Sequence, residues 1–450
     1  MVSHRFGKFV NEFLNMAFGA YVFFYYESEI GLATWLTGIG YIIFAIWNAI
    51  NDPLVGYLLD RPFKFTRKWG RRFPWVFIGG IPWLICYILI FTPPAVDPKS
   101  EPLLIFFWLI FSTCLYDTFG SIFNVNFYAI FPDKFRNATE RRVASTLSTY
   151  VGASGVAMGA IIPPLFIEFN DLQSYILQAG VIIIILFIAL ALSIPGCKED
   201  KTRIENYLEN WKKMEKRESF FKIFKFCLKH KNFMAYIIAY TFYQSLVQSI
   251  IGSIPYVADF VLDIESDAIT IIMASFLLGV LISMPIWAYI ANKTDNDRKT
   301  MIFAALFLTI ATGILFFIRD YMVLLIFMLI WGFGEGGFWV MMSPVFSNAI
   351  DESVIMTKQR REGIYNGIQT FFGRAAMVAQ AISFSTIHTL TGFQQDANTQ
   401  TPLAIMGIQL HFSIIPMIFI LITVITLWKF YDITPNKARK IKETMAELKL

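Results

Sequence analysis

Long apolar stretches separated by short polar connections dominate the chain. Six stretches lie in the first half, at roughly residues 5–26, 33–59, 74–93, 103–131, 144–167 and 174–195. Six more follow, at roughly 233–258, 268–291, 300–318, 321–350, 364–391 and 404–430. Because about 20 apolar residues are enough for a helix to cross a bilayer, the pattern predicts an all-α membrane protein with twelve transmembrane helices in two six-helix bundles.

One long polar connection separates the two sets of spans. It predicts an N-terminal six-helix bundle at 1–197, a cytoplasmic linker at 198–231, a C-terminal six-helix bundle at 232–431 and a cytoplasmic tail at 432–450. Within the linker, apolar residues from Phe220 to Leu228 repeat at helical spacing, with lysines on another face. This indicates a helix lying on the inner leaflet. The alternative is a basic segment that only leads into the next span.

The charges of the connections indicate the orientation of the chain. The connections after the second, fourth and tenth spans are basic, whereas those after odd-numbered spans are mainly acidic. Lys and Arg are retained on the cytoplasmic side of a membrane. We therefore expect both termini in the cytoplasm. We also expect a multi-pass protein of the plasma membrane that is a monomer.

Composition excludes several classes of protein. With 56% hydrophobic and 16% charged residues, the chain lies outside soluble averages, and the net charge of +5 arises from loops, so no nucleic-acid partner is expected. The four cysteines lack metal-binding spacing. We find neither a nucleophile, base or metal motif of a membrane enzyme nor an added signalling domain of a sensor. Transport is the favoured function, with no cofactor beyond a coupling Na⁺ or H⁺.

A carboxylate and three amides lie inside the second and fourth spans. Asn48 and Asp52 are one turn apart, Asn51 is adjacent, and Asn124 shares the depth of Asp52. Ionisable groups in a span are costly and mark function, and these oxygens are ligands that Na⁺ accepts. Asp52 could instead hold a proton or pair with a base, while the amides could join helices by hydrogen bonds. Asp117 is a second ionisable candidate on the same face as Asn124.

Other charges in the spans suit substrate binding. Glu12, beside Asn11 in the first span, could accept from substrate hydroxyls or pair with Arg374 of the eleventh span. In the tenth span, Glu335 lies one turn before Trp339, whose indole is either a platform for a sugar face or part of the packing.

Further charges lie at the inner edge of the membrane. They are Asp60, Arg61, Arg71 and Arg72. They could form a gate of ion pairs, or only set the topology. His388 and His411 are expected to be packed rather than to carry protons.

The stretch from Ile46 to Pro53 (Ile-Trp-Asn-Ala-Ile-Asn-Asp-Pro), followed by Gly56, resembles the glycoside-pentoside-hexuronide:cation symporters, the melibiose permease-like family of the major facilitator superfamily. Supporting matches are Phe338-Trp339 and Arg361-Glu362-Gly363 leading to Gln369-Thr370. The resemblance covers the whole chain. It implies two six-helix bundles, alternating access, and a sugar-like substrate that moves with Na⁺, Li⁺ or H⁺.

The resemblance also implies roles for particular residues. The three cation-site carboxylates of the family look like Asn48, Asp52 and Asn124 here, so one charge of three remains and a monovalent cation should bind less tightly. The sugar-site positions of the family look like Asn11, Glu12, Tyr128, Trp339 and Arg374, the aromatic pair being Tyr128 and Trp339, while Ser148 replaces an arginine.

Together these features predict a secondary active transporter that moves a sugar or glycoside as a Na⁺ or H⁺ symporter. The predicted substrate-binding set is Asn11, Glu12, Tyr128, Glu335, Trp339 and Arg374, and no metal is expected beyond Na⁺ at Asp52. Two alternatives remain open. The same branch of the superfamily includes a vertebrate lysophospholipid symporter, so the substrate could be an amphiphile, and the missing acids could indicate an uncoupled facilitator.

Overall fold

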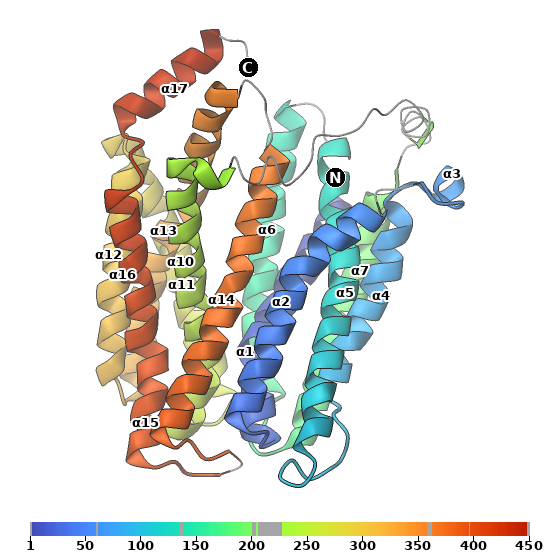
Figure 1. Cartoon of the computed structure of the whole chain (residues 1–450), viewed down its shortest axis with the longest axis vertical. Coiled ribbons are helices and arrows are strands. Elements are labelled where there is room, and N and C mark those ends of the chain that lie inside the picture. The colour runs from blue at the N-terminus through green and yellow to red at the C-terminus, as the bar shows by residue number, and fades with distance from the viewer. Residues whose placement is uncertain are drawn as a thin grey trace. The chain divides into compact units, whose positions relative to one another are not determined.

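The computed structural model describes residues 2–59, 62–134, 138–199, 204–205, 227–357, 362–395 and 397–447. Regular secondary structure in these ranges is helical throughout (Figure 1). Nine helices of the described residues are long and apolar enough to cross a membrane. The predicted all-α membrane fold is therefore confirmed.

The chain folds as two compact units. The first unit comprises Met1–Arg217 with two short segments, Ile264–Thr270 and Gln394–Thr399; the second comprises the remaining residues up to Leu450. The predicted interfacial helix at 220–228 lies outside the described residues, apart from its last two positions.

The first unit contains the first six predicted spans. Its long helices are α1 (Val2–Phe24), α2 (Thr34–Leu59), α4 (Phe73–Ile90), α5 (Pro102–Lys134), α6 (Ala138–Ile161) and α7 (Leu172–Cys197). Shorter elements are the π-helical η1 (Tyr25–Glu29), α3 (Thr66–Trp69) and the 3₁₀ turn η2 (Pro163–Leu165). Helix α1 packs on α6 and α7, and α5 packs on α2 and α4.

The second unit contains the remaining spans. Its helices are α10 (Lys231–Tyr256), α11 (Ala268–Thr294), α12 (Asp297–Ile314), α13 (Tyr321–Thr357), α14 (Glu362–Thr391), α15 (Pro402–Gln409), α16 (Ile415–Lys429) and α17 (Pro435–Glu447). Two π-helical turns, η3 (Val257–Val261) and η5 (Leu410–Ile414), and the 3₁₀ turn η4 (Leu315–Phe317) complete it. The twelfth predicted span is thus α15, η5 and α16 in succession.

Three predicted spans, in α1, α6 and α14, are not among the nine apolar helices of the described residues. The reason is their polar content, which includes Glu12 in α1 and Arg374 in α14. Polar residues in spanning helices are tolerated where they face protein or water rather than lipid.

Glycines allow α11 and α13 to approach closely. A Cβ atom added at Gly332 would lie 2.2 Å from the carbonyl oxygen of Phe276, and one added at Gly336 would lie 2.1 Å from Oγ of Ser283. These two glycines of α13 are four residues apart, the spacing of the small-residue motif that brings membrane helices together. The packing of α13 on α11 therefore depends on the absence of side chains at these positions.

A carboxylate caps the start of α4. The backbone N–H groups of Arg72 and Phe73 donate to Oε2 of Glu199, at 2.8 and 3.3 Å. Gly70 has φ of 95°, and a Cβ atom there would lie 2.3 Å from the same oxygen. A negative charge at a helix N-terminus satisfies amide groups that lack a partner within the helix.

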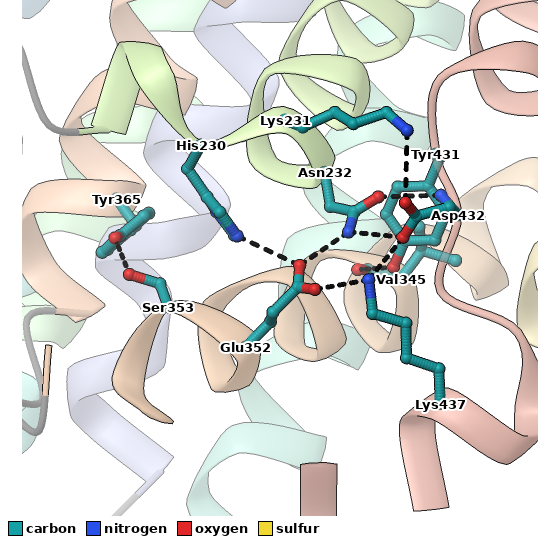
Figure 2. Close-up of polar contacts among 10 residues, drawn as sticks. All are labelled: His230, Lys231, Asn232, Val345, Glu352, Ser353, Tyr365, Tyr431, Asp432 and Lys437. Carbon is teal, nitrogen blue, oxygen red and sulfur yellow. Dashed lines mark hydrogen bonds and ion pairs between the residues drawn. The ribbon is translucent and has the colours of Figure 1, made fainter. Parts of the chain in front are cut away.

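Polar contacts hold α17 to the rest of the second unit (Figure 2). Nζ of Lys437 lies 2.6 Å from Oε1 of Glu352 in α13 and 2.5 Å from Oδ1 of Asp432. Nδ2 of Asn232 donates to Oε2 of Glu352 at 2.6 Å and to Oδ1 of Asp432 at 2.8 Å. His230 Nε2 is 3.0 Å from Oε2 of Glu352. One lysine of α17 therefore bridges two carboxylates.

Replacing Lys437 by alanine should loosen α17, because the two carboxylates lose the cation that they share. We expect a stability loss of about 1 kcal/mol, since Lys437 and Asp432 are more than one third exposed and water screens the pair. Hydrogen exchange of residues 435–447 measures the loosening. Lys440→Ala is the control, because Lys440 is exposed on the same helix. Equal protection in the two variants would contradict a bridging role.

The ionised state of Asp432 supports this attachment. Partial burial acts to raise the pKa of its carboxyl group, but hydrogen bonds from Lys437, Asn232 and Lys231 outweigh burial and lower that pKa to about 2. An unperturbed aspartate has a pKa of about 3.9. The contribution of Asp432 to stability is therefore fully present above about pH 4 and is lost as the pH falls towards 2.

Candidate functional site

Helices α2 and α5 lie side by side and in register within the first unit (Figure 1). Side-chain hydrogen bonds that join them include Trp47 to Thr118 (3.1 Å), Asn51 to Asp117 (2.9 Å) and Ser121 to Asp52. The partners are separated by 71, 66 and 69 residues. Because these separations are nearly constant, the two helices run parallel, and the polar face of α2 meets the polar face of α5.

Two amide oxygens near these hydrogen bonds have no hydrogen-bond partner among the described residues. They are Oδ1 of Asn48 and Oδ1 of Asn124, and both are buried. Asn48 is only 4% exposed and lies one turn before Asp52. An unsatisfied buried carbonyl group is costly, and nearly all such groups have a partner in native proteins. These two oxygens and the Asp52 carboxylate are donors of the kind that bind a hard cation.

The polar side chains Asn48, Asn51, Asp52, Asp117, Ser121 and Asn124 form what we call the α2–α5 cluster. Ser121 is the member that the sequence did not lead us to predict. Its hydroxyl donates to Oδ1 of Asp52. The signal was present, because Ser121 lies one turn from both Asp117 and Asn124 on α5, so all three share a helix face. Asp117, the second ionisable candidate, is buried and accepts from Asn51.

Two residues of the predicted substrate-binding set, Asn11 and Tyr128, contact each other in the first unit. Nδ2 of Asn11 donates to the hydroxyl of Tyr128 at 3.1 Å, and Nδ2 of Asn15 donates to Oδ1 of Asn11 at 3.1 Å. Tyr128 is 44% exposed, so its ring can contact a ligand. Glu12 is half-buried, and Gly155 of α6 leaves room for its Cβ.

The other residues of the predicted substrate-binding set, Glu335, Trp339 and Arg374, lie in the second unit. Glu335 and Trp339 differ in how exposed they are. Glu335 is 4% exposed, and its Oε1 accepts from the hydroxyl of Tyr243 in α10. Trp339, one turn further along α13, is 37% exposed. Arg374 follows Gly373, where a Cβ atom would lie 2.9 Å from the ring of Tyr240. Glu335 thus belongs to the core of this unit, whereas Trp339 does not.

The predicted gating residues are only partly described. Asp60 and Arg61 lie outside the described residues. Arg71 and Arg72 precede α4, where the backbone N–H of Arg72 bonds Glu199 as part of the helix cap.

The two histidines that the sequence led us to expect as packing residues, His388 and His411, lie together in the second unit. His388 Nε2 lies 2.9 Å from Nε2 of His411, and both are fully buried beside Phe384 and Phe393.

Comparisons with known proteins agree on the class of protein. A family model described as "MFS/sugar transport protein" matches residues 3–435. The sodium-dependent lysophosphatidylcholine symporter 1 of Mus musculus is 21% identical, over 90% of this chain and 79% of that protein. The uncharacterized symporter YnaJ of Bacillus subtilis is 23% identical, over 98% of this chain and 93% of that protein.

Solved structures share the fold. The crystal structure of tetrameric PepTSo2 matches with a TM-score of 0.56 and 13% identity, over 99% of this chain and 98% of that one. A bacterial homologue of the human drug peptide transporters PepT1 and PepT2 matches with a TM-score of 0.60 and 12% identity, over 95% and 96%.

Proposed function

The chain belongs to the MFS/sugar transport protein family of secondary transporters, which are not enzymes, and we propose that it is a Na⁺-coupled symporter of an amphiphile of the lysophospholipid type. The observation that carries the coupling is the α2–α5 cluster, where two buried amide oxygens near the Asp52 carboxylate lack partners among the described residues. A bound Na⁺ would be coordinated by both amide oxygens and by the Asp52 carboxylate.

We propose an amphiphile as the substrate in place of the sugar that the sequence favours. The mouse relative described above is a lysophosphatidylcholine symporter by name, which favours the amphiphile over the sugar. The chemistry of the predicted residues agrees. The Glu12 carboxylate and the exposed Tyr128 ring, both in the first unit, suit the quaternary ammonium group of such a lipid.

A sugar or glycoside is the second candidate. The chain of amides and hydroxyl from Asn15 through Asn11 to Tyr128 favours it, because such groups both donate to and accept from sugar hydroxyls. We further propose that the protein acts as a monomer in the plasma membrane with both termini in the cytoplasm, an orientation that the distribution of loop charges supports.

Uptake by proteoliposomes tests this function. We would supply labelled lysophosphatidylcholine or labelled melibiose, with a Na⁺ gradient or with K⁺ alone. Uptake of the lysolipid above equilibrium only with Na⁺ is the expected result. Accumulation of melibiose alone would replace the amphiphile by a sugar. Uptake that never exceeds equilibrium, with or without Na⁺, would show an uncoupled facilitator and remove the cation from the mechanism.

A further inference from the structure

The second unit buries a carboxyl group that the proposed Na⁺ site does not use. Glu335 lies within α13 and is 4% exposed. Its Oε1 accepts from the hydroxyl of Tyr243 in α10, whose ring stacks on Phe338 with centroids 4.0 Å apart. Its Oε2 is buried and has no hydrogen-bond partner among the described residues. The carboxyl group therefore makes one polar contact where an ionised group would need several.

The groups facing Glu335 supply no positive charge within the part of the chain that the structure describes. Helix α10 presents Tyr243, with Tyr240 and Tyr236 further along the same face. Helix α11 places Ser283 and Trp287 against the glycines that follow Glu335, and α12 places Phe307 and Leu308 against the glycine that precedes it. The indole N–H of Trp287 is used by the carbonyl of Phe333, at 2.9 Å.

Among the described residues, Glu335 forms no ion pair with a basic side chain, and its hydrogen-bond partner is the Tyr243 hydroxyl. A buried ionised carboxylate without a counter-charge is strongly unfavourable, and such a group takes up a proton instead. The surroundings therefore favour the neutral carboxylic acid in the conformation described here.

We propose that Glu335, together with Tyr243, is a proton-binding site in the second unit, so that this symporter takes up and releases H⁺ in addition to the cation at Asp52. The proposal rests on the proposed function in one respect, namely that the protein is a symporter. It assigns to Glu335 the binding of a proton in place of the substrate contact expected from the sequence.

The proton balance of this site is simple. In the neutral state the carboxylic acid holds the proton and shares a hydrogen bond with the Tyr243 hydroxyl. When a change of conformation lets water reach Oε2, the acid releases H⁺ to that water. The carboxylate left behind accepts from Tyr243 at Oε1 and from water at Oε2. Return to the conformation in which water does not reach Oε2 requires the carboxylate to bind a proton again. This requirement links the conformational change to proton uptake.

Infrared spectroscopy of the purified protein tests the protonation state directly. The difference spectrum between wild type and Glu335→Gln at neutral pH should show the carbonyl stretch of one protonated carboxyl group. Glu352→Gln is the matched control, because Glu352 is paired with Lys437 and should lose an ionised carboxylate band instead. An ionised carboxylate in the Glu335 difference would overturn the proposal.

A second variant keeps the test valid if Glu335→Gln does not fold. Tyr243→Phe retains the acid but removes its hydrogen-bond partner, so the protonated carboxyl band should shift to a higher frequency. A band unmoved by this substitution would contradict the pairing.

Proton movement during transport is a second test of the Glu335 site. Together with the infrared spectra, it separates a failure of this proposal from a failure of the proposed substrate. Proteoliposomes containing a pH-sensitive dye should acidify when lysophosphatidylcholine enters, and Glu335→Gln should reduce that acidification at least ten-fold at equal lysolipid uptake. Unchanged acidification would overturn the role in coupling. If the wild type carries no lysophosphatidylcholine, the proposed substrate fails, while the infrared spectra still decide whether Glu335 binds a proton.

Discussion

Replacing Asp52 by asparagine is expected to abolish the stabilisation of the protein by Na⁺. Asn48 and Asn124 are already neutral, so this change removes the only formal charge from those three positions. A ligand that binds the folded state at 100 times its Kd stabilises that state by about 2.7 kcal/mol. Thermal unfolding of the purified protein in NaCl and in choline chloride measures this difference, which should be present in the wild type and absent in Asp52→Asn.

Two further variants sharpen the test. Asn48→Asp places a second carboxylate one turn from Asp52, so it should raise the affinity for Na⁺. Asp117→Asn keeps a hydrogen-bonding group opposite Asn51 and should weaken the Na⁺ response less than Asp52→Asn does. An unchanged Na⁺ response in Asp52→Asn would exclude Asp52 from the cation site.

Replacing Gly332 by valine is expected to disrupt the packing of α13 on α11. The atom nearest to an added Cβ is a backbone carbonyl oxygen of α11, at 2.2 Å. Backbone cannot move aside as a flexible side chain can, so the helices must separate. Overpacking of this kind typically costs about 1–3 kcal/mol, and sometimes more, and we expect the upper end of that range. Thermal unfolding in detergent measures the loss.

Gly367→Ala is the matched control for that substitution. Gly367 lies in α14 of the same unit, and an added Cβ there meets no atom of the described residues within 4 Å. Alanine within a helix is more favourable than glycine by about 0.5–1 kcal/mol, so this variant should be as stable as the wild type or more stable. Equal melting temperatures for Gly332→Val and the wild type would show that α11 and α13 do not need this close approach.

Much of the fold could be predicted from the sequence because a membrane leaves the chain few alternatives. Backbone polar groups in lipid must be satisfied within a helix or a closed barrel, so each long apolar run had to be a helix. The predicted span at 33–59 therefore matches α2 closely. The expectation that Asp52 and Asn124 share a depth used the same reasoning, and the structure pairs Asp52 with Ser121, one turn before Asn124.

Partners that depend on side-chain packing could not be predicted. Tyr243 and Glu335 are 92 residues apart, and their contact depends on how α10 packs against α13, which helix periodicity does not specify. The helix α17 was missed for a different reason. Its short amphipathic run is anchored by Lys437 to the nearby Asp432 and to Glu352 in α13, and the sequence does not specify the contact with α13.

The cap on α4 has a consequence for dividing the transporter into halves. The apolar sequence of the sixth span ends at Cys197, which is the obvious place to cut the chain. Glu199, two residues later, satisfies the first amides of α4, a helix that begins 126 residues earlier in the sequence. A first half expressed on its own should therefore extend past Glu199, because a fragment ending at Cys197 would keep every span of that half and still lose the group that starts one of them.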